Sequence, residues 1–133
     1  MKQLTFILGL MALISCKDSG DFDLSYPLFE VADVSINSTT SITAEVAFTH
    51  IGSDEIVRHG FVWDWIRSPS LGTFGTISTG RGFIFIEEAP DFNGFSETIE
   101  TDFQRSQTHT IRAFVITQSD TIYSTAKQFL PNP

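Results

Sequence analysis

From residue 28 onward, apolar and polar side chains alternate with a spacing of two, and this pattern constrains the fold most strongly. Thr, Ser, Ile, Val and Phe dominate, and no segment of about ten residues combines helical periodicity with helix-forming composition. Because successive side chains of a strand point to opposite faces of a sheet, such alternation is typical of half-buried strands. The predicted strands cover residues 29–36, 42–48, 61–65, 95–103, 111–115 and 122–129. Turn signals such as Ser119-Asp120 separate these strands. Several short strands separated in this way predict an all-β sandwich or barrel.

The composition excludes several classes of protein. Hydrophobic residues make up 41% of the 133 residues and aromatic residues 13%, so a packed core is expected rather than disorder. The formal net charge is −8, which disfavours nucleic acid as a partner because phosphate backbones would be repelled. The single cysteine rules out an intramolecular disulfide, so burial and strand pairing must stabilise the domain.

The first residues have the features of a secretory signal. Lys2 gives a basic start, an uncharged, largely apolar run of 11 residues follows at 4–14, and the small Ser15 precedes Cys16. This run is too short to cross a bilayer, which takes about 20 residues. Residues 1–15 are therefore predicted to be a signal peptide.

The sequence Leu13-Ile14-Ser15-Cys16 resembles a bacterial lipobox. The resemblance implies cleavage before Cys16, lipidation of its sulfur and acylation of the new amino group, so that several acyl chains would hold the protein on a membrane. Residues 16–27, which are polar and acidic, are expected to form a flexible tether. In Bacteroidetes-type lipoproteins short acidic stretches here direct the protein to the cell surface. We therefore expect an outer membrane lipoprotein, with the cell-surface face favoured over the periplasmic one.

Four motifs in order resemble a fibronectin type III-like domain of Bacteroidetes-type lipoproteins. They are SITAEV at 41–46, RHGFVW at 58–63, IRAFV at 111–115, and TIYS at 121–124 followed by Phe129. The resemblance implies an immunoglobulin or fibronectin type III-like antiparallel β-sandwich of about seven strands over residues 28–130. It places His109 at the tyrosine-corner position, where a ring nitrogen would bond back to the backbone.

The segment 72–94 is longer and more apolar than that family's pattern, and its run GRGFIFI at 80–86 lacks clean alternation. The apolar residues 80–88 fit an extra edge strand, a segment buried on both faces, or an interaction surface. Trp65 lies near a strand end, where it either packs against the core or stacks on a ligand. The candidate ligand or partner contacts are Trp65, Phe83 and Phe85.

No catalytic or metal-binding pattern is found. His50, His59 and His109 are interpreted as polar residues at strand ends, because their spacing demands no metal. The acidic loop 87–93 is interpreted as solvated, with calcium binding as the alternative. There is no Gly-x-Ser-x-Gly elbow and no Gly-rich phosphate loop with a Lys. We therefore predict no cofactor, no metal and no enzymatic activity.

These observations favour a non-catalytic binding or structural module, displayed on a membrane through the lipid on Cys16. Adhesion, or service as an accessory subunit of a cell-envelope complex, fits such a module, with a protein as the partner. A second hypothesis is a carbohydrate-binding surface lipoprotein of an outer-membrane glycan uptake system. A small hydrolase is the third. A glycan array would test the second hypothesis, and an activity screen the third.

Overall fold

The computed structural model describes residues 24–66, 74–104 and 106–131, and these form eight β-strands and no helix. The predicted signal peptide, Cys16 and most of the predicted tether lie outside the described residues. No helix among the residues described is long and apolar enough to cross a membrane. The strands are β1 (Leu28–Ser38), β2 (Ser41–His50), β3 (Ile56–Trp65), β4 (Gly82–Ile86), β5 (Gly94–Glu100), β6 (His109–Thr117), β7 (Thr121–Tyr123) and β8 (Lys127–Phe129).

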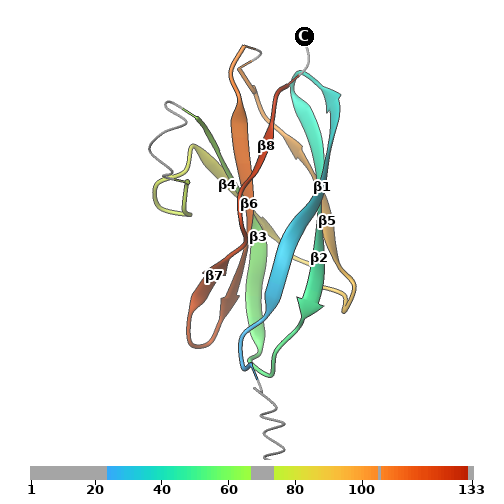
Figure 1. Cartoon of the computed structure of the whole chain (residues 1–133), viewed down its shortest axis with the longest axis vertical. Helices are drawn as coiled ribbons and strands as arrows, with labels where there is room; N and C mark the ends of the chain where they lie inside the picture. Colours follow the sequence, from blue (N-terminus) through green and yellow to red (C-terminus); the bar gives the residue numbers. More distant parts are fainter. Residues whose placement is uncertain (1–23, 67–73, 105, 132–133) are drawn as a thin grey trace, which may run out of the picture.

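The strands form two antiparallel sheets that pack face to face (Figure 1). The three-stranded sheet has the order β1-β2-β5, and the five-stranded sheet has the order β4-β3-β6-β7, with β8 also pairing with β6. The chain passes from one sheet to the other between β2 and β3, and returns between β4 and β5. The predicted all-β antiparallel sandwich is confirmed.

The core lies between the two sheets, and the alternation in the sequence specifies it. In β2, Ile42, Ala44 and Val46 are buried, whereas Glu45 between them is exposed. The aromatic side chain of Phe95 reaches across from β5 to contact Phe61 of β3, with ring centroids 5.4 Å apart. The buried core residues are Val31, Ile42, Ala44, Val46, Phe61, Ile99, Phe103, Ile111, Ala113 and Phe129.

The strand predicted at 122–129 is interrupted, which gives eight strands where about seven were expected. Between β7 and β8 the Ser124 side chain replaces the regular ladder: its Oγ accepts a hydrogen bond from Ala113 N at 2.9 Å and donates one to Thr125 O at 2.7 Å. Ser124 N also donates to Ala113 O at 2.9 Å. Both pieces pair with β6, so they act as one broken edge strand.

Other boundaries differ by a few residues. The strand predicted at 95–103 ends at Glu100, and Phe103 enters the core from the following loop. The hairpin after β6 turns at Gln118 and Ser119, one residue earlier than predicted. Thr117 stabilises this turn, because its Oγ accepts hydrogen bonds from the Ser119 and Asp120 amides.

The apolar run at 80–86 forms β4, an edge strand, which is one of the three structures expected for it. β4 approaches β3 so closely at Gly60 that an added Cβ would lie 1.9 Å from Ile84 O. Glycine is therefore required at this position for β4 to pair with β3.

Candidate functional site

The outer face of the five-stranded sheet carries aromatic and arginine side chains instead of the usual polar ones. Because Phe61 faces the core, its neighbours Gly60 and Val62 face outward, and so do their β4 partners Phe85 and Phe83. We call this surface the aromatic–arginine face. It consists of Arg58, Phe74, Phe83, Phe85, Arg112 and Tyr123, above the buried ring of Phe114.

Phe83 and Phe85 contact each other edge to face, with ring centroids 5.4 Å apart and planes at 74°. Phe85 in turn meets Phe114 at 5.5 Å and 90°. Phe114 is fully buried although it points away from the core, so the outer layer is closely packed around it. The Arg58 guanidinium lies 5.0 Å from the centroid of Phe85, a cation–π contact at an exposed side chain.

Arg112 is held rigidly on the same face. Its Nε donates a hydrogen bond to Ser124 O at 2.9 Å, and its guanidinium lies 4.7 Å from the Tyr123 ring. Burial lowers the pKa of Arg112 from its ordinary value, but the group stays positively charged at any physiological pH. A fixed, partly desolvated cation next to aromatic rings is well suited to bind a carboxylate.

The described residues that lead into β4, from Phe74 onward, contact this face. Ile77 N donates a hydrogen bond to Tyr123 Oη at 3.1 Å, and the Phe74 ring lies 6.0 Å from the Arg112 guanidinium. Phe74 and Phe83 remain 43% and 45% exposed, so large apolar side chains still meet solvent. The predicted contact segment 72–94 thus supplies three of the six residues of the face, while residues 72 and 73 lie outside those described.

The opposite outer face of the sandwich is chemically different. Along the three-stranded sheet, Thr43 bonds Thr98 across strands at 3.1 Å, and Asp33 lies opposite Glu45. The exposed carboxylates on its strands include Glu30, Asp33, Glu45 and Glu100. Arg58 and Arg112, two of the three arginines within the described part of the chain, lie on the outer face of the other sheet.

The structure brings Phe83 and Phe85 together but does not place Trp65 with them. Trp65 follows Phe61 and Trp63 at spacings of two, so it points to the other side of the sheet. It is partly buried, and the guanidinium of Arg81 lies 3.1 Å from the centroid of its ring. One face of the indole is therefore already covered.

His109 lies in the core end of β6, stacked on Phe129 with a ring distance of 5.4 Å. Its Nε2 lies 3.2 Å from the carbonyl oxygen of Gln104, five residues upstream, and donates a hydrogen bond to it. This is the kind of bond back to the backbone that a tyrosine at the corner makes. Burial lowers the pKa of His109, while the Gln104 carbonyl opposes that shift.

The interpretation of His59 as a polar residue at a strand end is wrong. It lies inside β3, is 2% exposed and meets Phe95 edge to face at 4.5 Å, because it takes a core-facing position of the alternation. Burial lowers the pKa of its imidazole. His50 does lie at a strand end, where its Nε2 bonds the Leu24 carbonyl at 2.9 Å.

The acidic loop 87–93 ends in a tight hairpin, in which Asp91 and Gly94 exchange backbone hydrogen bonds of 3.1 and 3.0 Å. Gly94 adopts a φ of 139°, and Phe92 at the tip is 79% exposed. Within residues 24–66, 74–104 and 106–131, no three His, Cys, Asp or Glu side chains are grouped as metal ligands. Calcium binding by this loop remains an alternative without geometric support.

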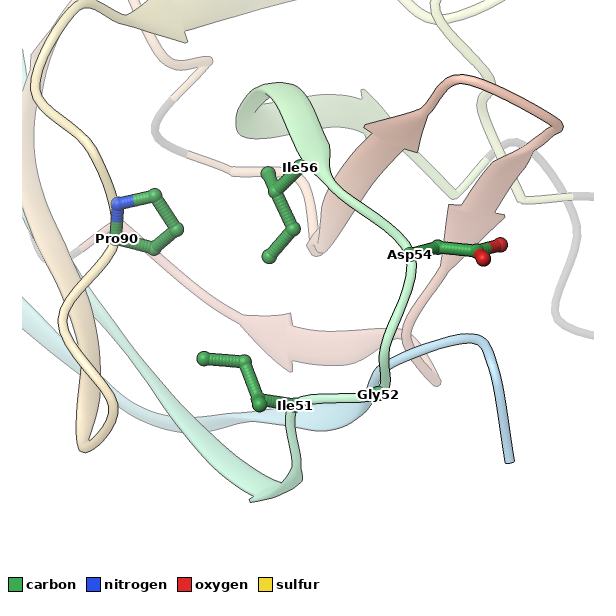
Figure 2. Close-up of a pocket in the computed structure, with 5 residues that line it drawn as sticks. All are labelled: Ile51, Gly52, Asp54, Ile56 and Pro90. Atoms are coloured by element: carbon green, nitrogen blue, oxygen red, sulfur yellow. The ribbon is translucent and has the colours of Figure 1, made fainter. Parts of the chain in front are cut away.

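A hollow of about 260 Å³ opens at the end of the sandwich where β1 begins. Figure 2 shows the side chains of Ile51, Ile56 and Pro90 facing one another across it, while the Asp54 carboxylate points away. The side chains that face the hollow are apolar, and Asp54, the ionisable residue of its lining, is turned away from it.

Comparisons with known proteins extend only to the fold. No family model matches this chain, and no curated protein matches it significantly. Among solved structures, it is similar to one described as "Myokine structure", with 13% sequence identity and a TM-score of 0.49 over 83% of this chain and 99% of that chain.

Proposed function

We propose that this chain is a membrane-anchored lipoprotein whose fibronectin type III-like sandwich is a non-catalytic binding module. It serves in adhesion or as an accessory subunit of a cell-envelope complex. The aromatic–arginine face carries the proposal, because it combines exposed aromatic rings with fixed cations on an otherwise acidic protein. Aromatic residues and arginine are the side chains most enriched at protein interfaces.

The chemistry of this face favours a protein partner that presents apolar side chains flanked by carboxylates. Phe83 supplies an exposed anchor, while Arg58 supplies charge beside Phe85 and Arg112 supplies charge beside Tyr123. The net charge of −8 makes this face a local exception, which would orient an acidic partner toward it.

A glycan fits this face less well than a protein does. Sugar rings stack on flat, open aromatic platforms, whereas Phe83 and Phe85 are inclined at 74° to each other. Trp65, the other candidate platform, already has Arg81 over one ring face. These contacts support the protein hypothesis over the carbohydrate one.

Photo-crosslinking in the cells that make the lipoprotein tests the proposal. A photoreactive phenylalanine at position 83 is compared with one at position 45, which is exposed on the opposite sheet. We expect a discrete adduct with a second protein from position 83 and none from position 45. Arg58→Glu combined with Arg112→Glu should reduce that adduct about tenfold, since charged contacts and the desolvated guanidinium are lost.

Equal adducts from both positions, or none from position 83, would contradict the proposal. Retention of the purified protein on a glycan affinity gel, lost on Trp65→Ala, would favour the carbohydrate hypothesis instead. An adduct with exactly twice the mass of the chain reports self-association, which is a separate question.

A further inference from the structure

β4 is an edge strand of the five-stranded sheet that the described residues form. One side of the strand pairs with β3, and no described residue pairs with its other side. Its sequence Gly-Phe-Ile-Phe-Ile contains no charge and no proline, and Phe83, its second residue, is 45% exposed. A regular, uncharged edge offers its free backbone N–H and C=O groups to another strand.

The other edges within the described ranges carry features that discourage such pairing. β1 has exposed charges and several register shifts against β2, which bend the strand. In β5, Glu97 lies opposite the core residue Ala44, at a position of the alternation that faces inward. Its charge therefore points toward the inside of the sandwich. β7 and β8 have three residues each and are separated by the Ser124 interruption. Among these edges, β4 is therefore the one best suited to pair with a strand from another chain.

The residues of β4 are self-complementary about Ile84. If two copies pair antiparallel with Ile84 opposite Ile84, then Phe83 of each copy lies directly opposite Phe85 of the other on the outer face. Just beyond the strand, the same register sets Arg81 of each copy opposite Glu87 of the other. Both of these side chains are exposed, so two equivalent ion pairs would form.

We propose that the β4 edge is a homodimer interface, in which two copies of this chain join their five-stranded sheets into one continuous antiparallel sheet. Because Arg81 and Glu87 would pair across the interface, a second copy of this chain fits the edge better than an unrelated strand does. The dimer would set two aromatic–arginine faces side by side. It does not depend on the proposed binding function.

Disulfide trapping tests the register. Two differently tagged full-length chains, one with Phe83→Cys and one with Phe85→Cys, are produced together and their membranes are oxidised. Directly opposite residues have Cα atoms within disulfide range, whereas two copies of residue 83 are diagonal and lie beyond it. We expect the mixed pair to give about tenfold more dimer than Phe83→Cys alone.

Wild type controls for Cys16, and Glu45→Cys controls for random collisions. A mixed pair that gives no more dimer than Phe83→Cys alone would overturn the proposal.

Charge reversal gives an independent test by sedimentation equilibrium of the solubilised full chain. Arg81→Glu and Glu87→Arg should each weaken dimerisation, because each sets like charges opposite each other across the interface. The double reversal should restore it toward wild type, a rescue that misfolding does not produce. Phe92→Lys, at an exposed hairpin tip away from β4, is the matched control and should dimerise like wild type. A monomeric wild type, or no rescue in the double variant, would refute the interface.

Discussion

Two histidines in this sandwich are enclosed by aromatic rings rather than by water or acidic partners. His59 lies against Phe95, and His109 lies between Phe103 and Phe129. His59 Nε2 and His109 Nδ1 are buried and have no hydrogen-bond partner among the residues described. Protonation of either imidazole is therefore disfavoured, because burial among aromatic rings penalises the charged form.

We therefore predict that the free energy of unfolding decreases as the pH falls below 6.5. Burial lowers the pKa of both histidines in the folded state, so the unfolded chain binds more protons in that range. The contribution of each histidine to the free energy of unfolding is complete above the pKa that its imidazole has in the unfolded chain. It is lost as the pH falls through the lower pKa of the folded protein, by at most about 1.4 kcal/mol per pH unit for each histidine. Urea unfolding at several pH values from about 7.5 down to about 5 measures the slope.

The variant His59→Phe should lower that slope, because one of the two buried imidazoles is gone while the ring contact is kept. His50→Gln, at an exposed strand end, should keep the wild-type slope. An unchanged slope in His59→Phe would show that this histidine is not the source of the pH dependence.

At the scale of single residues, the sequence predicts the aromatic–arginine face only in part. Phe83 and Phe85 stand out because they lie in an apolar run without alternation. Arg58 and Arg112 do not stand out, because an arginine at an outward position looks like any solvated residue. A feature of β6 could have indicated the site. Phe114 lies at a position where the alternation of the strand predicts a solvent-facing side chain. An aromatic residue there indicates that other side chains cover the outer face, and the rings of Phe85 and Tyr123 do so.

At the scale of elements, the interruption of the last strand depends on one side chain. Ser124 is 3% exposed, and its Oγ satisfies the Ala113 amide where the ladder is broken. We expect Ser124→Ala to lower the free energy of unfolding by about 1–3 kcal/mol, because a buried N–H loses its acceptor.

Urea unfolding checks this prediction against Ser96→Ala, an exposed serine of β5. The control should change stability by less than about 0.5 kcal/mol. If the two variants are equally stable, the interruption does not need the hydroxyl group.

Strand positions follow from the sequence because alternation records which face of each strand is buried. The interruption between β7 and β8 does not follow, since Ser124 looks like an ordinary polar position until its partner on β6 is known. The same holds for β4, whose five apolar residues fit a buried or an exposed strand equally well. Only the pairing with β3 assigns it to an edge.

For the whole molecule, the sequence predicts the sandwich, because the number and spacing of alternating segments leave few other folds. The gathering of Arg58 and Arg112 on one outer face could not be predicted, since it depends on which strands share a sheet. The lipid anchor at Cys16 remains a prediction from the lipobox alone.

Protease treatment of intact cells tests where the anchored domain resides. Because the surface location is favoured, we expect the protease to degrade the mature chain in intact cells. An immunoblot follows the chain, with a periplasmic protein as the control. Cys16→Ala should abolish acyl labelling and release the chain from membranes, because the lipid is its proposed anchor. Protection until the outer membrane is opened would instead place the domain in the periplasm.

The described chain begins at one end of the sandwich, where it enters β1, and leaves β8 at the opposite end (Figure 1). Tension applied between these two points would run along the strands, while the ladder hydrogen bonds lie across them. The bonds between β1 and β2 would then be loaded together in shear instead of being unzipped one at a time. A domain of this geometry would resist extension, as a link between a membrane and a pulling partner requires.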